Sequence, residues 1–276
     1  MKSTIEIVLE AGRSRKDYWR DIFRYRELFY ILAWRDITVR YKQTAIGIAW
    51  AVVRPFLTMV ILTVIFGRVA NLPSEGTAPY AILVMTGMLP WTLFATSLGE
   101  ASGSLIANSN LISKVYFPRL IVPTAAVITA FVDFLIGLIM LFGMMAYYHF
   151  VPSWRICLLP VFMVLALLAS LGPGLYATSL NVKYRDFRYI IPFFVQFGLY
   201  VSPVGFSSNL IPEKWRMLYS LNPVVGVIDG FRWCLLGGES SLHLTGFCTS
   251  LFAIGCFLWL GVHTFRGMER SFADII

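Results

Sequence analysis

The sequence has few charged residues. Asp, Glu, Lys and Arg make up 14% of its 276 residues, whereas 58% are hydrophobic, and the mean hydropathy is +0.71. Soluble domains carry about 25% charged residues, so the composition excludes an ordinary soluble protein and predicts an integral membrane protein. A net charge of +8 would point to nucleic acid in a soluble protein. Here the basic residues gather in a few segments between apolar runs, so we expect membrane lipids and no nucleic acid as partners.

Several motifs that carry chemistry are also absent. The chain has no G-x-x-x-x-G-K-[ST] segment, which excludes an ATP-phosphate cradle of its own, and no H-E-x-x-H or G-x-S-x-G segment. Its four cysteines are scattered without a CxxC pair and are expected to be free thiols. Acidic residues in the loops are isolated. We therefore expect no catalytic site, no metal and no cofactor bound by this chain.

Six apolar stretches are long enough to cross the roughly 30 Å hydrocarbon layer. They lie near Ile46–Phe66, Tyr80–Leu98, Ile121–Phe150, Ile156–Leu180, Tyr189–Phe206 and Leu242–Phe265. The third exceeds the required length and is expected to tilt or break. The sequence thus predicts an all-α, polytopic membrane protein. We expect a cytoplasmic segment over residues 1–45 and a six-span transmembrane domain over residues 46–276.

The distribution of basic residues predicts the orientation. Seventeen of the 23 lysines and arginines fall on the N-terminal side of the membrane, five on the other side, and Arg54 within the first span. Because lysine and arginine concentrate in cytoplasmic segments, both termini are expected in the cytoplasm.

The segment Tyr18–Lys42 alternates apolar residues with arginines. Tyr18, Ile22, Tyr25, Phe29 and Leu32 recur at the spacing of one helix face. This pattern predicts an amphipathic helix in the membrane interface, whose arginines reach lipid headgroups or a protein partner.

Two connections between spans carry structure of their own. In Gly99–Leu120 the part Asn108–Val115 predicts a short helix that ends before Pro118. In Ser207–Ser241 two apolar runs flank Asn222-Pro223, and each is too short to span. They predict a pair of re-entrant helices on the outer side, which line a cavity or an exit because backbone at membrane depth needs protein or water around it.

The stretch Asn181–Phe206 begins with a basic loop and continues into the fifth span. Phe193, Phe197 and Tyr200 lie on one helix face there, with Phe194 and the uncharged Gln196 beside them. Aromatic residues at this spacing either pack against other helices or line a pathway, and periodicity alone leaves both interpretations open.

Asp133 is the one carboxylate deep inside a predicted span. Ionisable residues at such depth usually have a function. Three interpretations stand: a hydrogen bond to a neighbouring helix, a place along a substrate path, or proton coupling.

Four separated segments carry a family resemblance. They are Gly47–Val69, Asn108–Pro123, Tyr184–Val204, and Asn222–Arg232 taken together with the tail Phe265–Ile276. In this order they resemble the membrane subunit of type-2 ATP-binding-cassette exporters, in the branch that exports O-antigen, capsular polysaccharide or teichoic acid. The resemblance runs from about Tyr30 to Ile276.

The resemblance implies a bacterial inner-membrane permease. It implies a homodimer that works with two copies of a separate ATPase, on which ATP and Mg²⁺ bind, and that moves lipid-linked polysaccharide outward. The family's cytoplasmic loop after the second span contacts the ATPase. The expected contact residues here are Asn108, Leu111, Lys114, Tyr116 and Arg119, with Arg185 and Arg188 of the basic loop.

The resemblance also favours the path interpretation for the fifth span, because pyranose rings stack their apolar CH faces on aromatic side chains. The family commonly has Asn or Gln where this chain has Arg54. That arginine is expected to bind a pyrophosphate or an acidic sugar, or else the inner lipid headgroups. Two alternative functions are export of a drug or a small lipid by the same fold, and an integral-membrane glycosyltransferase.

Overall fold

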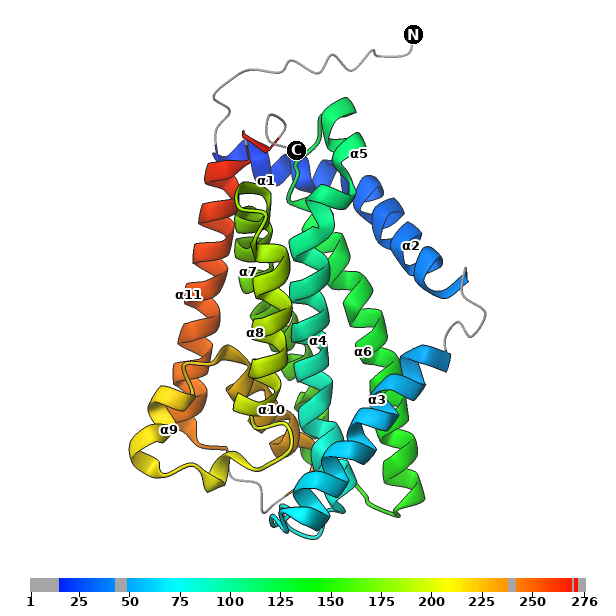
Figure 1. Ribbon diagram of the computed structural model, residues 1–276, viewed down its shortest axis with the longest axis vertical. Coiled ribbons are helices and arrows are strands. Elements are labelled where there is room, and N and C mark those ends of the chain that lie inside the picture. The colour runs from blue at the N-terminus through cyan, green and yellow to red at the C-terminus, as the bar shows by residue number, and fades with distance from the viewer. Residues whose placement is uncertain (1–14, 43–48, 238–241, 270, 273–276) are drawn as a thin grey trace.

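The computed structural model describes residues 15–42, 49–237, 242–269 and 271–272. All the regular elements within these ranges are helical, which confirms the predicted all-α class (Figure 1). The elements are α1 (Arg15–Arg24), α2 (Arg26–Lys42), α3 (Ala49–Leu62), the π-helix η1 (Thr63–Val69), α4 (Tyr80–Ala107), α5 (Ser109–Lys114), α6 (Ile121–Tyr147), the 3₁₀-helix η2 (Trp154–Leu158), α7 (Leu159–Lys183), α8 (Phe187–Val201), the 3₁₀-helix η3 (Ser208–Leu210), α9 (Glu213–Tyr219), α10 (Pro223–Leu235) and α11 (Leu244–Met268).

Five helical segments are long and apolar enough to cross a membrane. They are Ala49–Val69, Tyr80–Ala107, Ile121–Tyr147, Trp154–Lys183 and Leu244–Met268. They correspond to five of the six predicted spans. The third, α6, is one continuous helix of 27 residues, roughly 40 Å long. The predicted start of the first span and the predicted domain boundary after residue 45 lie in residues 43–48, outside the described residues.

The remaining predicted span, Tyr189–Phe206, is shorter as a helix than expected. α8 has 15 residues, which corresponds to roughly 22 Å. It ends because Ser202 precedes Pro203, and the proline ring disfavours helical backbone at the residue before it. Ser202 is accordingly extended, with φ −81° and ψ 152°. The last predicted residues of this span therefore form a turn.

The helix α4 lies at the centre of the bundle. It is apolar on all sides and packs against α6, α7 and α10, so that most of its length is buried (Figure 1). Buried residues of these helices form the main hydrophobic core, which includes Leu83, Met85, Phe134 and Phe231. Of the predicted re-entrant pair, α9 is exposed over most of its length, whereas α10 contributes its apolar residues to this core.

The N-terminal segment forms two helices and not the single one predicted. A turn at Tyr25 separates α1 from α2. Leu32 is buried, and the other residues of the predicted apolar stripe are partly buried against a second cluster that contains Ile112 and Phe265. The stripe therefore packs on the protein itself, because the second cluster offers it an apolar surface.

Small residues let α7 and α11 approach closely. A Cβ atom added at Gly172 would lie 2.6 Å from the Leu258 nitrogen, and one added at Gly261 would lie 2.2 Å from the Gly172 carbonyl oxygen. Helices packed in membranes commonly use small residues in this way, since backbone contact compensates for the weak apolar driving force between helices in lipid.

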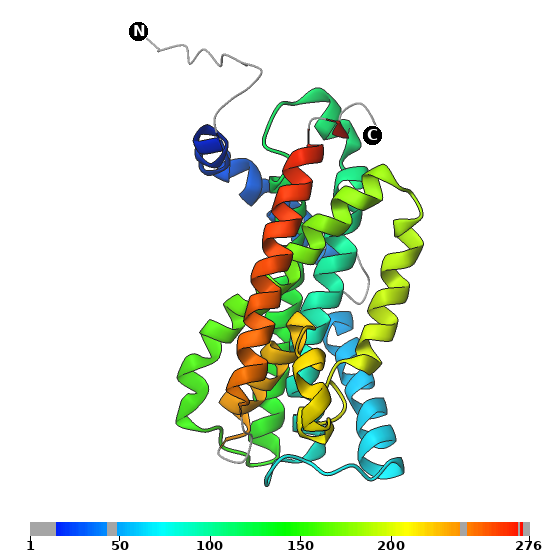
Figure 2. The ribbon, with the colours of Figure 1, turned by 90° about the vertical axis from the view of Figure 1, so that its left-hand side faces the viewer.

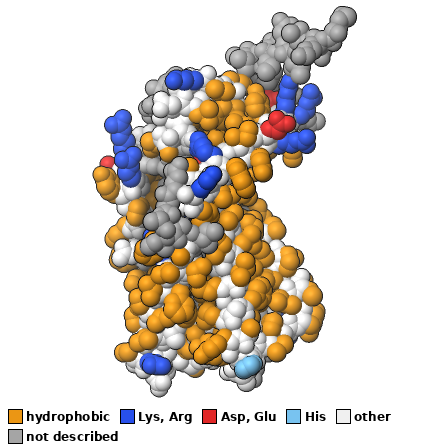
Figure 3. All heavy atoms as spheres, turned by 90° about the vertical axis from the view of Figure 1, so that its right-hand side faces the viewer, with side chains coloured by type: hydrophobic (Ala, Val, Ile, Leu, Met, Phe, Trp, Pro, Cys, Tyr) orange, Lys and Arg blue, Asp and Glu red, His pale blue; other side chains and the backbone are white. Residues whose placement is uncertain are grey.

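The two ends of the molecule differ in charge. The end that carries α1, α5 and the last turn of α11 is called here the basic end, and the end that carries α9 and residues 70–79 the opposite end (Figures 1 and 2). On the face drawn in Figure 3, basic side chains gather toward the basic end, and a broad belt of hydrophobic side chains follows below them. This distribution is typical of a membrane-embedded protein.

Candidate functional site

The aromatic face of α8, formed by Phe193, Phe194, Phe197 and Tyr200, is uncovered by the rest of the described chain. These side chains are 57–66% exposed, and the Phe193 and Phe197 rings lie 4.5 Å apart. Gln196 is also exposed. α8 is attached to the bundle through contacts with α4 and α7, and it stands at one side of the molecule in Figure 2. In the described chain these aromatic residues therefore do not form core packing.

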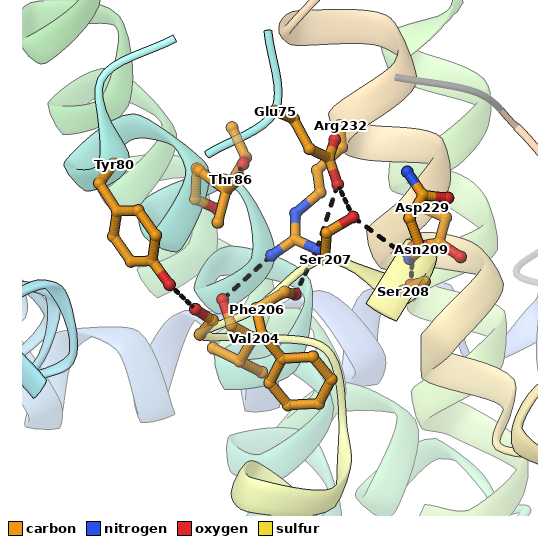
Figure 4. Close-up of polar contacts among 12 residues, drawn as sticks. Glu75, Tyr80, Thr86, Val204, Phe206, Ser207, Ser208, Asn209, Asp229 and Arg232 are labelled. Atoms are coloured by element: carbon orange, nitrogen blue, oxygen red, sulfur yellow. Dashed lines mark hydrogen bonds and ion pairs between the residues drawn. The ribbon is translucent and has the colours of Figure 1, made fainter. Parts of the chain in front are cut away.

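A buried arginine holds the turn that follows α8. Arg232 of α10 is completely buried, and its guanidinium donates hydrogen bonds to the carbonyl oxygens of Phe206 (2.8 Å) and Val204 (3.1 Å) (Figure 4). Its Nη1 atom lies 3.9 Å from a carboxylate oxygen of Glu75. The turn has left the helix, so its carbonyl groups need donors from elsewhere. The guanidinium supplies them in the planar arrangement that arginine offers.

Further contacts tie the same turn to the loop before α4 and to α10. Ser207 donates a hydrogen bond to Glu75, Ser208 donates one to Asp229, and Tyr80 donates one to the Gly205 carbonyl oxygen at 2.5 Å (Figure 4). The guanidinium reaches its place because Gly87 of α4 has no side chain. A Cβ atom there would lie 2.8 Å from Arg232 Nη2. Residues 202–209, α10 and the loop before α4 thus form one connected polar cluster, called here the Arg232 cluster.

The sequence around Asn222-Pro223 explains why α10 begins where it does. The Asn222 side chain accepts a hydrogen bond from the Val224 backbone N–H at 3.1 Å, and Pro223 occupies the first helical position. Both residue types are favoured at these places. The Asn222 amide also donates to the Ser202 hydroxyl at 2.9 Å, which adds a second link to the end of α8.

Asp133 binds two side chains of α2. It accepts hydrogen bonds from Arg40 and from the Tyr41 hydroxyl, and Arg40 also lies 2.6 Å from Glu100 of α4. The contact corresponds to the first of the three interpretations given for Asp133, a hydrogen bond to a neighbouring helix. These residues and Arg54 line a cavity of about 560 Å³ between α2, α3, α4 and α6.

The predicted partner-contact residues lie at the basic end. α5 covers Ser109–Lys114, within the predicted stretch Asn108–Val115 and before Pro118, and is anchored by the buried Ile112. Asn108 accepts a hydrogen bond from Arg35 of α2 at 2.8 Å, which joins the loop to the N-terminal segment. Most of the remaining predicted side chains are exposed or partly exposed there: Leu111, Lys114, Tyr116, Arg185 and Arg188.

Arg119 is engaged within the chain. Its backbone N–H donates to the Glu269 carboxylate at 2.8 Å, and its guanidinium donates to the Glu269 carbonyl oxygen at 2.5 Å. The Tyr18 hydroxyl donates to the same carboxylate at 3.0 Å. Glu269 therefore connects α1, the loop after α5 and the end of α11.

The Glu269 contacts predict that the stability with which α1 is held against the bundle depends on pH. Burial raises the pKa of the Glu269 carboxyl above its ordinary value of 4.5. The folded chain then keeps this proton at pH values where the unfolded chain has lost it, so the contribution of Glu269 to stability is greatest below the ordinary pKa and falls as pH rises through the raised one. We expect the hydrogen-exchange protection of α1, corrected for the intrinsic rate, to decrease from acid to neutral pH.

The Glu269→Gln variant should lose most of this pH dependence, because glutamine does not titrate. Glu213→Gln alters an exposed acid at the opposite end and should leave the profile unchanged. An identical profile in wild type and Glu269→Gln would show that another group controls the docking of α1.

The sequence patterns did not predict that Arg232, Glu75, Glu269 and Arg40 connect separate parts of the fold. Arg232 lies on the apolar pattern of a predicted re-entrant helix, and a charged residue in such a pattern is a signal for a specific partner. Its partner Glu75 is distant in sequence and could not be paired with it in advance. No group of three or more His, Cys, Asp or Glu side chains suited to a metal occurs in the part of the chain that the structure describes.

Comparison with known proteins gives a consistent result. A family model for ABC-2 type transporters matches residues 27–236. The chain is 26% identical over 260 residues to the O-antigen export system permease protein RfbA of Klebsiella pneumoniae, covering 91% of this chain and 95% of that protein. It is 27% identical over 263 residues to RfbA of Myxococcus xanthus, covering 93% and 98%. It is 21% identical over 244 residues to the polysialic acid transport protein KpsM of Escherichia coli, covering 86% and 92%.

The family match covers well over half of the chain and confirms the resemblance drawn from the four sequence segments. The chain belongs to the ABC-2 type transporter family of membrane permeases.

Proposed function

We propose that this chain is the membrane subunit of an ATP-driven exporter that moves lipid-linked polysaccharide outward across the bacterial inner membrane. Its relatives are named as O-antigen and polysialic acid transport proteins. We further propose that the active unit is a homodimer with two copies of a separate ATPase, which binds ATP and Mg²⁺, and that both termini lie in the cytoplasm. In this arrangement the permease itself catalyses no reaction.

The uncovered aromatic face of α8 carries the proposal. Phe193, Phe197 and Tyr200 are each more than half exposed, although α8 belongs to a bundle with a large apolar core. A second protomer placed against this side would turn the face toward a space between the two copies. Aromatic rings there offer weak, repeated contacts to pyranose rings, and conduction of a long polymer requires contacts that are easily released. Phe194, Gln196, Arg54 and Asp133 complete the proposed substrate path.

The basic end is the proposed ATPase surface. The loop with α5 and the N-terminal helices are joined through Arg35 and Asn108, and Glu269 joins α1 to the end of α11. A displacement of α5 would therefore be transmitted to both the N-terminal segment and α11. We propose that closure of the two ATPase subunits shifts these elements as a body and opens the path formed by the first and fifth spans. The Arg232 cluster, which this orientation places on the outer side, then controls the exit.

Replacing Lys114 with glutamate tests this surface. Lys114 ends α5 and is exposed, so its charge is available to an acidic partner. Reversal of one interfacial charge places like charges together, and we expect roughly a ten-fold loss in affinity for the ATPase, measured by titration of the purified subunits. Lys214→Glu reverses an exposed charge at the opposite end and should have no effect. Equal affinities for wild type and Lys114→Glu would assign Lys114 to lipid headgroups.

The decisive test of the function is ATP hydrolysis by the purified complex with lipid-linked polysaccharides of different composition. Stimulation by one glycan class supports the proposal and identifies the substrate. A stable complex that responds to no glycan but to a drug or a small lipid would favour the second candidate, a small-molecule exporter with the same fold. Transport by the permease without any ATPase would contradict both.

A further inference from the structure

Among the described residues, the centre of the Arg232 cluster holds two carboxyl groups, from Glu75 and Asp229, and one guanidinium (Figure 4). The guanidinium of Arg232 donates its hydrogen bonds to the carbonyl oxygens of Val204 and Phe206. Within the described chain it forms an ion pair with Glu75, at 3.9 Å, and none with Asp229. Asp229 is therefore the acid of this cluster that has no cation in direct contact.

The contacts of Asp229 stabilise its ionised form only weakly. Among the described residues a single hydroxyl, that of Ser208, donates a hydrogen bond to this carboxyl group. A carboxylate becomes strongly acidic when two or three N–H groups donate to it, and removal from water has the opposite effect. Burial raises the pKa of the Asp229 carboxyl from 3.8 to about 6, although Ser208 and Arg232 both favour its ionised form.

The groups around Asp229 come from every element packed at this place. Arg216 of α9 also favours the ionised form, but its guanidinium contacts the His243 ring at 3.0 Å and the Ile211 carbonyl oxygen at 3.3 Å. Tyrosines stay neutral at neutral pH because their ordinary pKa is about 10. The charged and titratable side chains are Glu75 before α4, Tyr80 of α4, Arg155 of η2 on the Trp233 ring, Arg216 and Tyr219 of α9, Arg232 of α10 and His243 before α11.

The protonation state of Asp229 is linked to the position of the turn formed by residues 202–209. Ser207 and Ser208 are consecutive in this turn, and they donate to Glu75 and Asp229 respectively. An ionised Asp229 held against the turn costs free energy because burial removes water from the charge. Separation of the turn from α10 returns that water. Asp229 is partly exposed, so protons from the solvent can reach it.

We propose that Asp229 is a proton-binding site whose protonation holds residues 202–209 against α10 and whose ionisation releases them. The proposal rests on the proposed function in one respect, because it places the Arg232 cluster at the outer exit. The pH of the outer compartment then sets how readily this turn opens.

The direction of the effect follows from the two forms of the turn. With the turn released, the Asp229 carboxyl has its ordinary pKa of 3.8, and with the turn bound its pKa is about 6. Proton uptake therefore stabilises the bound form. The bound form is most favoured at acid pH and loses stability as the pH rises through about 6.

Hydrogen exchange of the full-length protein in phosphatidylcholine nanodiscs tests the site. Protection of peptides that cover residues 202–209, corrected for the intrinsic rate, should fall about ten-fold in wild type between about pH 5 and about pH 7.5. In Asp229→Asn the profile should be flat, with protection at neutral pH as strong as in acidified wild type. Asparagine does not titrate, and its carbonyl oxygen can still accept the Ser208 hydrogen bond.

Two control variants separate Asp229 from other titratable groups. Glu213→Gln alters an exposed acid of α9 at the same end, and His243→Gln removes the ring that contacts Arg216. Histidine ordinarily changes its charge between about pH 5 and 8, so it is the competing group. Both variants should keep the wild-type profile. A profile that disappears in His243→Gln and persists in Asp229→Asn would overturn the proposal.

A shift in midpoint distinguishes proton binding from a structural contact. Ser208→Ala removes the hydroxyl that favours the ionised Asp229, so its pKa rises and the midpoint of the profile moves to higher pH. A change that only loosened the turn would lower protection at every pH and leave the midpoint in place. This measurement decides the question even if Asp229→Asn does not fold. An unmoved midpoint, or a flat profile in wild type, overturns the proposal.

The proton site and the export function fail independently, since the exchange measurement uses the permease without ATPase or glycan. A flat profile together with normal glycan-stimulated ATP hydrolysis would refute the proton site and leave the export function standing. An Asp229-dependent profile in a protein whose complex responds to no glycan would refute polysaccharide export and leave the proton site standing.

Discussion

Replacing Arg232 with methionine is expected to lower the free energy of unfolding by about 3–5 kcal/mol. The substitution leaves the largely buried Glu75 carboxylate without its positive partner and removes both donors from the carbonyl groups of Val204 and Phe206. For a chain of this length the loss corresponds to a decrease of roughly 5–15 °C in thermal midpoint. The measurement is thermal unfolding of the purified protein in detergent, followed by intrinsic fluorescence.

A double variant and a control make this result specific. Adding Glu75→Gln to Arg232→Met removes the uncompensated charge, so part of the stability should return. Arg155→Met is the control, because Arg155 stacks on the Trp233 ring at 4.7 Å and such a contact contributes only about 0.5–1 kcal/mol at an exposed site. If Arg232→Met unfolds at the wild-type temperature, the Arg232 cluster does not depend on this arginine.

The triple variant in which alanine replaces Phe193, Phe197 and Tyr200 is expected to reduce polysaccharide export at least about ten-fold. Each lost ring contact contributes of the order of 0.5–1.5 kcal/mol. A ten-fold change needs only about 1.4 kcal/mol. Assembly with the ATPase should be unchanged, since these side chains are more than half exposed and contribute little to the core. Export is measured in inverted vesicles with the lipid-linked glycan, and assembly by co-purification.

The matched control for the aromatic face lies on α11. Phe252 and Trp259 are 70% and 67% exposed there, so the Phe252→Ala, Trp259→Ala variant removes similar apolar area from another side of the bundle. It should export normally. Unchanged export in the α8 variant would show that these aromatic residues pack against another protein surface or against lipid. Equal losses in both variants would indicate a general effect of removing exposed aromatic residues.

The class of the protein and most of its helices follow from the amino-acid sequence alone. Long apolar runs must be helical in a membrane because every backbone polar group needs a partner within its own segment. Five spans, the short helix α5 and the two short helices around Asn222-Pro223 follow from such local rules, and the structure contains all of them. The aromatic face of α8 is also readable from sequence, because it depends only on helical spacing.

The pairing of distant polar and charged side chains depends on the folded bundle. Arg232 and Glu75, Arg40 and Asp133, and Tyr18 and Glu269 are pairs far apart in sequence. Each pair forms because burial makes an isolated charge or polar group costly, so the fold brings a partner to it. No local pattern contains that information. The burial of α10 and the exposure of α8 were likewise decided by packing, since both segments are apolar and only the bundle determines which one is covered.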